Sequence, residues 1–232
     1  MTLIKLSLLL FALLMPSLAN ALTMGEREYE CPLGGQKFTA ISVNSYTQFG
    51  KRLDLKPFGT FIAPIPLPIC PENGFIIYKQ DFSEEEVEII KPFILSSEYQ
   101  TLRRNNTGHY LLAKVFEYQK EDIEEIAYSY LQASWETERE RTRYVKYLGL
   151  AIEAYQRVLE KKSITQETEF TARFLLVELN RLRGNFDLAK SKLSDLLKHV
   201  EISGFKKKII ELERKLIKDE NSVPQDIPTS DD

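Results

Sequence analysis

The sequence predicts an α+β protein that is predominantly α, in which a small β-rich lobe precedes a series of helical hairpins. From residue 22 to residue 82 the chain is rich in Pro and Gly and has only short β-branched and aromatic runs, which favours strands and irregular loops. From Ser83 to residue 219 the apolar residues recur at helical spacing. One helical segment also occurs twice, which indicates repeated hairpins.

The first 21 residues have the features of a secretory signal peptide. Residues 1–5 carry one positive charge, residues 6–15 are almost wholly apolar, and Ala19-Asn20-Ala21 provides a cleavage pattern of small residues. This apolar run is about half the length that a helix needs to span a bilayer. We therefore expect cleavage after Ala21, no stable membrane anchor in the mature chain, and export to an oxidising compartment such as the bacterial periplasm, with secretion as a further possibility.

The composition is that of a folded protein with a mild net charge. The 232 residues include 31 Lys and Arg against 34 Asp and Glu, which gives a net charge of −3, and 43% of the residues are hydrophobic. A mildly acidic chain exerts no long-range attraction on nucleic acid or anionic lipid. We therefore expect no nucleic-acid partner, and enough apolar surface to fill a core.

Cys31 and Cys70 are the only cysteines, and they begin similar segments, CPLGG and CPENG. A zinc knuckle has the form Cys-Pro-x-Cys-Gly, whose tight turn directs two thiolates at one metal. Here Gly34 and Asn73 replace the second cysteine of each knuckle. Two thiolates cannot complete a tetrahedral site, so the lobe is predicted to be a degenerate zinc ribbon that binds no metal.

In an oxidising compartment, the remaining sulfurs of two facing knuckles are expected to form a disulfide between Cys31 and Cys70. Two unpaired thiols or a redox-active pair are the alternatives. They are less favoured because no basic residue lies within two positions of either cysteine to promote the thiolate.

Strands and helices follow from local patterns. Strands are predicted at 37–43 and 74–78, with an extended Pro-rich segment between them. Ser83 and Glu86 form a capping box that begins a helix, which Pro92 ends or kinks. Further helices are predicted at 97–104, 109–119, 122–137, 141–162, 166–183, 186–200 and 204–219. The acidic tail, 220–232, has no apolar periodicity and is predicted to be disordered.

The repeated segment covers residues 151–159 and 189–197. Each copy has Ala first, a bulky residue four positions later, and an apolar pair at positions seven and eight. The offset of 38 residues is close to the roughly 34 residues of a tetratricopeptide repeat (TPR). The second copy is preceded by Gly184-Asn185-Phe186-Asp187, similar to the turn of that repeat. We therefore favour TPR-like hairpins over an ordinary helical bundle.

The order of these features resembles an uncharacterised bacterial family, domain of unknown function 2225. In that family, two Cys-Pro-x-Cys-Gly segments precede a Phe-Ser/Thr-x-x-Glu helix and TPR-like helices. The matching residues here are Cys31-Pro32 with Gly35, Cys70-Pro71 with Gly74, 82–86 and 178–185. The resemblance covers about residues 29–200 and implies an architecture without implying an activity. Because Gly34 and Asn73 depart from the pattern, metal binding is not carried over.

Motifs of known chemistry are absent from the sequence. His109 and His199 are isolated, and there is no P-loop, G-x-S-x-G or G-x-G-x-x-G segment. The charged segment 136–143 is typical of a solvated helix end. Six aromatic residues of the helical region predict either a hairpin core or an aromatic-lined peptide groove; they are Tyr128, Tyr130, Trp135, Tyr144, Tyr147 and Tyr155.

These observations favour a non-catalytic, exported scaffold that binds a protein or peptide along its TPR-like helices, without a cofactor. Arg173, Asn180 and Arg181 lie opposite the apolar positions of their helix and are the predicted groove residues. A thiol redox or metal protein that uses Cys31 and Cys70 is the alternative. An enzyme whose residues are scattered along the chain is a third hypothesis.

Overall fold

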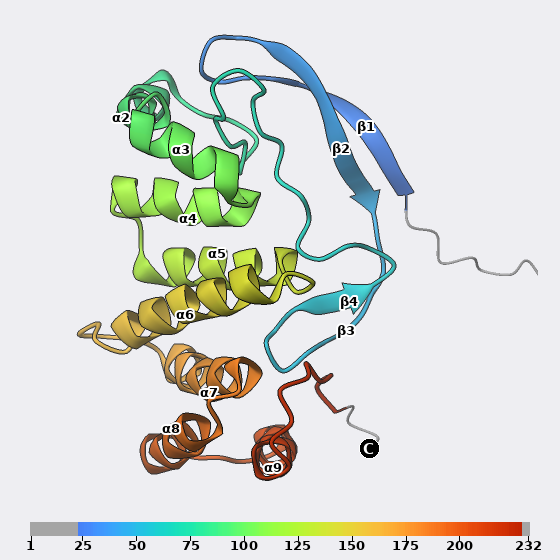
Figure 1. Ribbon diagram of the computed structural model, residues 1–232, viewed down its shortest axis with the longest axis vertical. Coiled ribbons are helices and arrows are strands. Elements are labelled where there is room, and N and C mark those ends of the chain that lie inside the picture. Colours follow the sequence, from blue (N-terminus) through green and yellow to red (C-terminus); the bar gives the residue numbers. More distant parts are fainter. Residues whose placement is uncertain (1–22, 229–232) are drawn as a thin grey trace, which may run out of the picture.

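The structure, a computed structural model, describes residues 23–228 (Figure 1). The predicted signal peptide, 1–21, lies outside the described residues. Figure 1 shows helices stacked along the long axis of the molecule, with the N-terminal segment running beside the stack before it enters the first helix. The architecture is α+β and predominantly α, as the sequence predicts.

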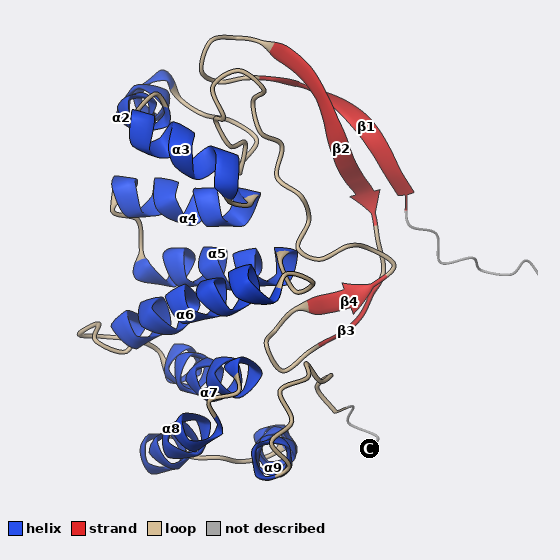
Figure 2. Ribbon diagram, viewed as in Figure 1, coloured by secondary structure: helices blue, strands red, loops and turns tan. Residues whose placement is uncertain are grey.

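The strands lie on one side of the helical stack (Figure 2). Strand β1 (Thr23–Glu30) pairs antiparallel with β2 (Lys37–Ser45), and β3 (Gln48–Lys51) pairs antiparallel with β4 (Pro57–Gly59). These are two separate two-stranded sheets. Of the two predicted strands, the first corresponds to β2.

The predicted strand at 74–78 is wrong. That segment makes only an isolated bridge, between Ile69 and Ile76. Its partner segment contains Pro66, Pro68 and Pro71, and a proline has no N–H to extend a ladder. The pairing therefore stops after a few bonds.

The helices follow the predicted order with small changes at their ends. Ser83 caps the first one, and both bonds of the predicted capping box are present, but this helix continues past Pro92. The helix predicted at 141–162 ends at Val158. The bounds are α2 (Glu84–Ile94), α3 (Ser97–Asn105), α4 (Gly108–Gln119), α5 (Ile123–Glu136), α6 (Arg141–Val158), α7 (Gln166–Arg183), α8 (Phe186–His199) and α9 (Phe205–Lys218).

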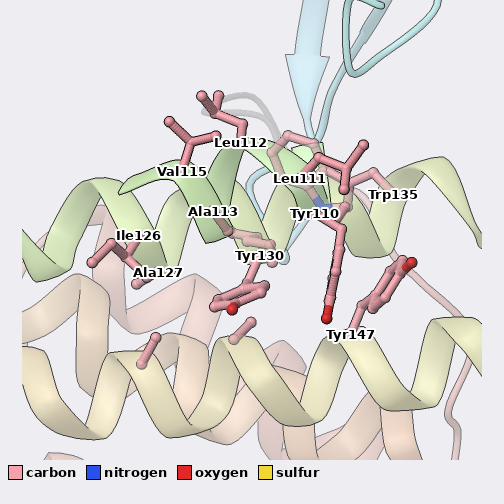
Figure 3. Packing of buried hydrophobic residues seen from close by; sticks show 14 of the residues in the cluster. Tyr110, Leu111, Leu112, Ala113, Val115, Ile126, Ala127, Tyr130, Trp135 and Tyr147 are labelled. Carbon is pink, nitrogen blue, oxygen red and sulfur yellow. The ribbon is translucent and has the colours of Figure 1, made fainter. Parts of the chain in front are cut away.

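The buried apolar residues form two clusters. The larger includes residues of α2 to α7 together with Cys31 and Cys70, and the smaller joins Leu53 to α7, α8 and α9. Figure 3 shows part of the larger cluster, where Tyr110, Tyr130 and Tyr147 gather between neighbouring helices. Both clusters contain residues from the N-terminal segment, so this segment shares its core with the helices.

The two copies of the repeated segment occupy equivalent places in α6 and α8. Ala151 and Ala189 are fully buried, as expected where a neighbouring helix crosses closely. The bulky residues four positions later, Tyr155 and Leu193, are buried as well. Small and large residues therefore alternate in the same way in both hairpins.

The C-terminal tail is predicted to be disordered, but as far as Pro228 it is bound to the rest of the chain. The N–H of Leu53 donates to Gln225 O at 2.8 Å, and the N–H of Ile227 donates to Lys51 O at 2.9 Å. The tail is therefore paired with the edge of β3. Ile227 also packs against the smaller cluster, so the tail is held by an apolar contact although its sequence has no apolar periodicity.

Candidate functional site

Each cysteine lies in a knuckle turn, and the two turns have the same backbone hydrogen bonds. Cys31 N–H donates to Gln36 O at 2.8 Å, and Cys70 N–H donates to Phe75 O at 2.9 Å. In each turn a glycine, Gly35 or Gly74, donates back to the cysteine carbonyl. Both glycines have positive φ, 71° and 81°, a conformation that other residues rarely adopt. The zinc-knuckle backbone is thus retained in both segments.

The predicted disulfide between Cys31 and Cys70 is present, with a Cα–Cα distance of 5.7 Å. Both cysteines are buried. Asn73, which stands where a knuckle has its second cysteine, donates to Leu33 O of the other knuckle at 2.6 Å and accepts from Phe75 N–H at 2.8 Å. The disulfide and the Asn73 side-chain amide therefore join two turns that a metal ion joins in an intact zinc knuckle pair.

The second knuckle is fixed to α3 by three side chains. Tyr99 is fully buried, and its hydroxyl donates to Gly74 O at 2.8 Å. Gln100 donates to Asn73 O at 2.8 Å, and Arg103 donates to Glu72 O at 3.0 Å. A methyl group at Gly74 would lie 2.6 Å from Arg103 Cδ, so the glycine also permits this close approach. The knuckle pair thereby attaches the start of the chain to the helical stack.

Arg181, a predicted groove residue, is fully buried and organises the other end of the molecule. It donates to both carboxylate oxygens of Glu178, at 2.8 and 2.7 Å, and lies 3.3 Å from Glu213 of α9. It also donates to the carbonyls of Asn221 and Val223 in the tail. Burial raises the pKa of both glutamates above their usual range.

The predicted groove through Arg173, Asn180 and Arg181 is therefore wrong for two of its three residues. Asn180 is buried and donates to Leu176 O within its own helix, and Arg181 is covered by the tail and α9. Arg173 is partly exposed, but it bridges Glu169 and Asp195 and so links α7 to α8. The prediction failed because helix α7 is covered on nearly every side.

The turn between β3 and β4 lies against the helices and is held there by apolar and charged residues. Leu53 is fully buried in the smaller cluster, and Leu55 packs against the larger one. Arg52 forms ion pairs with Asp54 and with Glu138 at the α5–α6 connection. Residues 52–56, which we call the inserted turn, therefore occupy part of the helical surface as a bound ligand would.

Lys56 completes this attachment, because its ammonium lies 2.7 Å from Glu138. Burial alone would raise the pKa of Glu138, but the hydrogen bonds from Arg52 and Lys56 outweigh it and lower the pKa. Asp54 is fully buried. The charged side chains of the inserted turn are thus paired with each other or with Glu138, where the turn contacts the helices.

An open cavity of about 280 Å³ continues from the inserted turn between α5, α6 and α7. Leu55 forms one wall, and Tyr128 and Tyr155 are two of the helical residues that line it. Thr168 and Thr171 of α7 add hydroxyl groups, and the α5 residue Glu125 adds a carboxylate. We call this cavity, together with the helical surface beside it that contacts the inserted turn, the α5–α7 face.

Of the six aromatic residues considered for a groove, only Tyr128 and Tyr155 line this cavity. Tyr128 is 41% exposed, whereas the other five are buried. Tyr130 donates to Glu117 at 2.7 Å and Tyr147 donates to Asn106 at 3.0 Å, so both have structural roles. The hairpin-core interpretation therefore holds for most of the set.

The two histidines are not brought together. His109 is buried, and its Nδ1 lies 2.9 Å from Glu136. His199 is exposed and contacts Asp195 one turn earlier in its own helix. Within residues 23–228, no group of three or more His, Cys, Asp or Glu residues could hold a metal ion.

The geometry defines a class: a stack of helical hairpins whose surface binds an N-terminal segment that contains twin knuckles. The chain belongs to the family described as an uncharacterised protein conserved in bacteria, DUF2225, whose pattern matches residues 24–219. This match confirms the resemblance inferred from the motifs. No curated protein and no solved structure matched the chain.

Proposed function

We propose that the protein is an exported, non-catalytic scaffold that binds a protein or peptide segment on its α5–α7 face. One observation carries the proposal: this face already accommodates a tight turn of the chain itself, with Leu55 packed beside an open cavity and Leu53 buried in the neighbouring smaller cluster. Helical repeats commonly bind extended segments along one face. A surface that accepts an apolar side chain from its own chain has the chemistry to accept one from a partner.

The cavity suggests what that segment contains. Tyr128 offers an exposed ring, Thr168 and Thr171 offer hydroxyl groups, and the Glu125 carboxylate makes no ion pair within residues 23–228. A peptide with an apolar residue next to a basic residue would match this combination. The inserted turn has the same order of chemistry, because Leu55 is followed by Lys56.

Export is supported by the disulfide, which persists in oxidising compartments. None of the described helices is long and apolar enough to cross a membrane. We therefore place the protein in the periplasm as part of the proposal. Burial of both cysteines leaves a redox partner without access to the sulfur atoms, so the scaffold is favoured over the redox alternative.

Selection of peptides from a displayed random library tests the proposal. The wild-type protein should enrich peptides that pair an apolar residue with Lys or Arg, and Thr171→Arg should abolish this enrichment by filling the cavity with a bulky cation. Thr101→Arg, at an exposed threonine of α3, is the matched control and should enrich the same peptides as wild type. Equal enrichment by Thr171→Arg and wild type would exclude the α5–α7 face.

A further inference from the structure

Helices α8 and α9 lie at the end of the stack (Figure 1). Residues of both helices line a second groove. Its volume is about 580 Å³, roughly twice that of the cavity on the α5–α7 face. Apolar residues form its floor and basic residues form much of its rim; they are Leu193, Leu197 and Ile217 below, and Lys190, Arg214 and Lys218 above. Apolar surface bordered by charge is typical of an interaction site.

The internal repeat shows that this groove lacks a covering element. Leu159, the C-cap residue of α6, and Leu197 in α8 occupy the same position of the repeated segment. Leu159 is half-buried and packs against the larger core cluster, whereas Leu197 is 37% exposed. After α9 the chain turns back to Arg181 and β3, so residues 221–228 do not cover Leu197.

The charge of the groove is also unbalanced. Helices α8 and α9 contain nine Lys and Arg against four Asp and Glu, although the whole chain has a net charge of −3. Within residues 23–228, the side chains of Lys190, Arg214 and Lys218 form no ion pair. Asp187 and Glu220 also lie on the rim, but they leave positive charge in excess. An acidic partner would therefore be attracted.

We infer that the α8–α9 groove binds an amphipathic helix of a partner protein, in which acidic residues flank an apolar stripe. A helix is the appropriate shape because the groove lies between two helices at the end of a stack, where a further helix would pack ridges into grooves. Its apolar stripe covers Leu193, Leu197 and Ile217, and its carboxylates pair with the basic rim. This site is separate from the α5–α7 face.

A designed peptide tests this inference directly. The probe is a fluorescein-labelled amphipathic helix of about five turns, with Leu at helical spacing and Glu on either side of the Leu stripe. The control peptide keeps every Leu and replaces Glu with Lys. Fluorescence anisotropy should show saturable binding of the acidic peptide and at least about tenfold weaker binding of the basic one.

Two variants of the protein identify the site. Leu197→Glu should abolish binding, and the double variant Lys190→Glu/Arg214→Glu should weaken it about tenfold or more. Lys162→Glu, at an exposed lysine after α6, is the matched control and should bind as wild type does. Circular dichroism and thermal unfolding establish that each variant is folded.

Several outcomes would overturn the inference. These are no binding of the acidic peptide up to about 100 µM, equal binding of both peptides, or unchanged binding by Leu197→Glu. If sedimentation shows a dimer and Leu197→Glu dissociates it, the occupant of the groove is a second copy of the chain instead. If the protein binds anionic vesicles but no peptide, and the double charge reversal abolishes vesicle binding, the groove binds a lipid surface instead. Because these substitutions lie in α8 and α9, failure here leaves the test of the α5–α7 face unaffected.

Discussion

The N-terminal segment is attached to the helical stack at two places, and the two attachments depend on different interactions. At the α3 end, the disulfide joins the two knuckles to each other, and hydrogen bonds from Tyr99, Gln100 and Arg103 hold the second knuckle against α3. At the α7–α9 end, Leu53 and a buried Arg–Glu cluster hold the inserted turn and the tail. A covalent bond keeps its strength whatever the pH, whereas a buried ion cluster is sensitive both to the loss of one member and to protonation. The comparison teaches that a covalent cross-link within the segment supports one attachment to the helices, whereas an ion cluster that depends on pH supports the other.

The largest effect should come from removing the guanidinium of Arg181. Arg181→Met leaves Glu178 and Glu213 buried without their cation and leaves two tail carbonyls without a donor, which should cost about 3–5 kcal/mol. Urea denaturation measures the loss. Arg173→Met is the control, since its ion pairs are partly exposed and should contribute about 0–1 kcal/mol. Equal losses in the two variants would contradict the role assigned to the buried cluster.

Removal of the disulfide should have the next largest effect. The bond closes a loop with a sequence separation of 39 residues, and the double variant Cys31→Ala/Cys70→Ala should lose about 2–4 kcal/mol. Limited proteolysis of this variant should cut first between Pro57 and Gly74, where the segment is released. First cleavage within α7, α8 or α9 would show that the two ends are not independent.

The side chain that joins the knuckles should contribute less than the disulfide. Asn73→Ala leaves the partly buried Leu33 carbonyl and Phe75 N–H without their partner, at a cost of about 1–2 kcal/mol. Asn105→Ala, at an exposed asparagine at the end of α3, should change the free energy of unfolding by less than about 0.5 kcal/mol. Thermal unfolding of both variants measures this difference. Equal stability of the two variants would contradict the role assigned to Asn73.

The smallest predicted effect is a dependence on pH at the α7–α9 end. Burial raises the pKa of Glu213 above its usual value of 4.5, so the folded chain binds more protons than the unfolded chain above that pH, and stability falls as pH rises through the folded pKa. Glu213→Gln removes this titration. The variant should gain about 1 kcal/mol over wild type at pH of about 8 and nothing at pH of about 4. A gain that is independent of pH would refute this explanation.

The sequence predicted the features that depend on local patterns. The helix order, the capping box at Ser83 and the pairing of Cys31 with Cys70 follow from periodicity and motif, and the structure confirms them. The twin positive-φ glycines of the knuckles were also recognisable in this way.

The features that depend on contacts between distant segments were not predictable. Asn180 and Arg181 face away from the apolar positions of an isolated helix, and only the return of the tail and α9 buries them. The inserted turn has no periodic signal, because Leu53 and Leu55 lie in a short segment without helical or strand periodicity. The one available signal was two leucines flanking an acid in a chain segment otherwise rich in Pro and Gly.

Hydrogen exchange measured by mass spectrometry on the oxidised protein tests the central claim most directly, namely that the helical stack binds the inserted turn. Leu53 N–H donates to Gln225 O and Leu55 N–H donates to Arg52 O, so both amides should be protected as strongly as the helical cores of α5 and α7. Leu53→Asp should abolish this protection while α3 and α4 keep theirs. Exchange of residues 52–56 at the rate of a free loop, with the helices fully protected, would contradict the account.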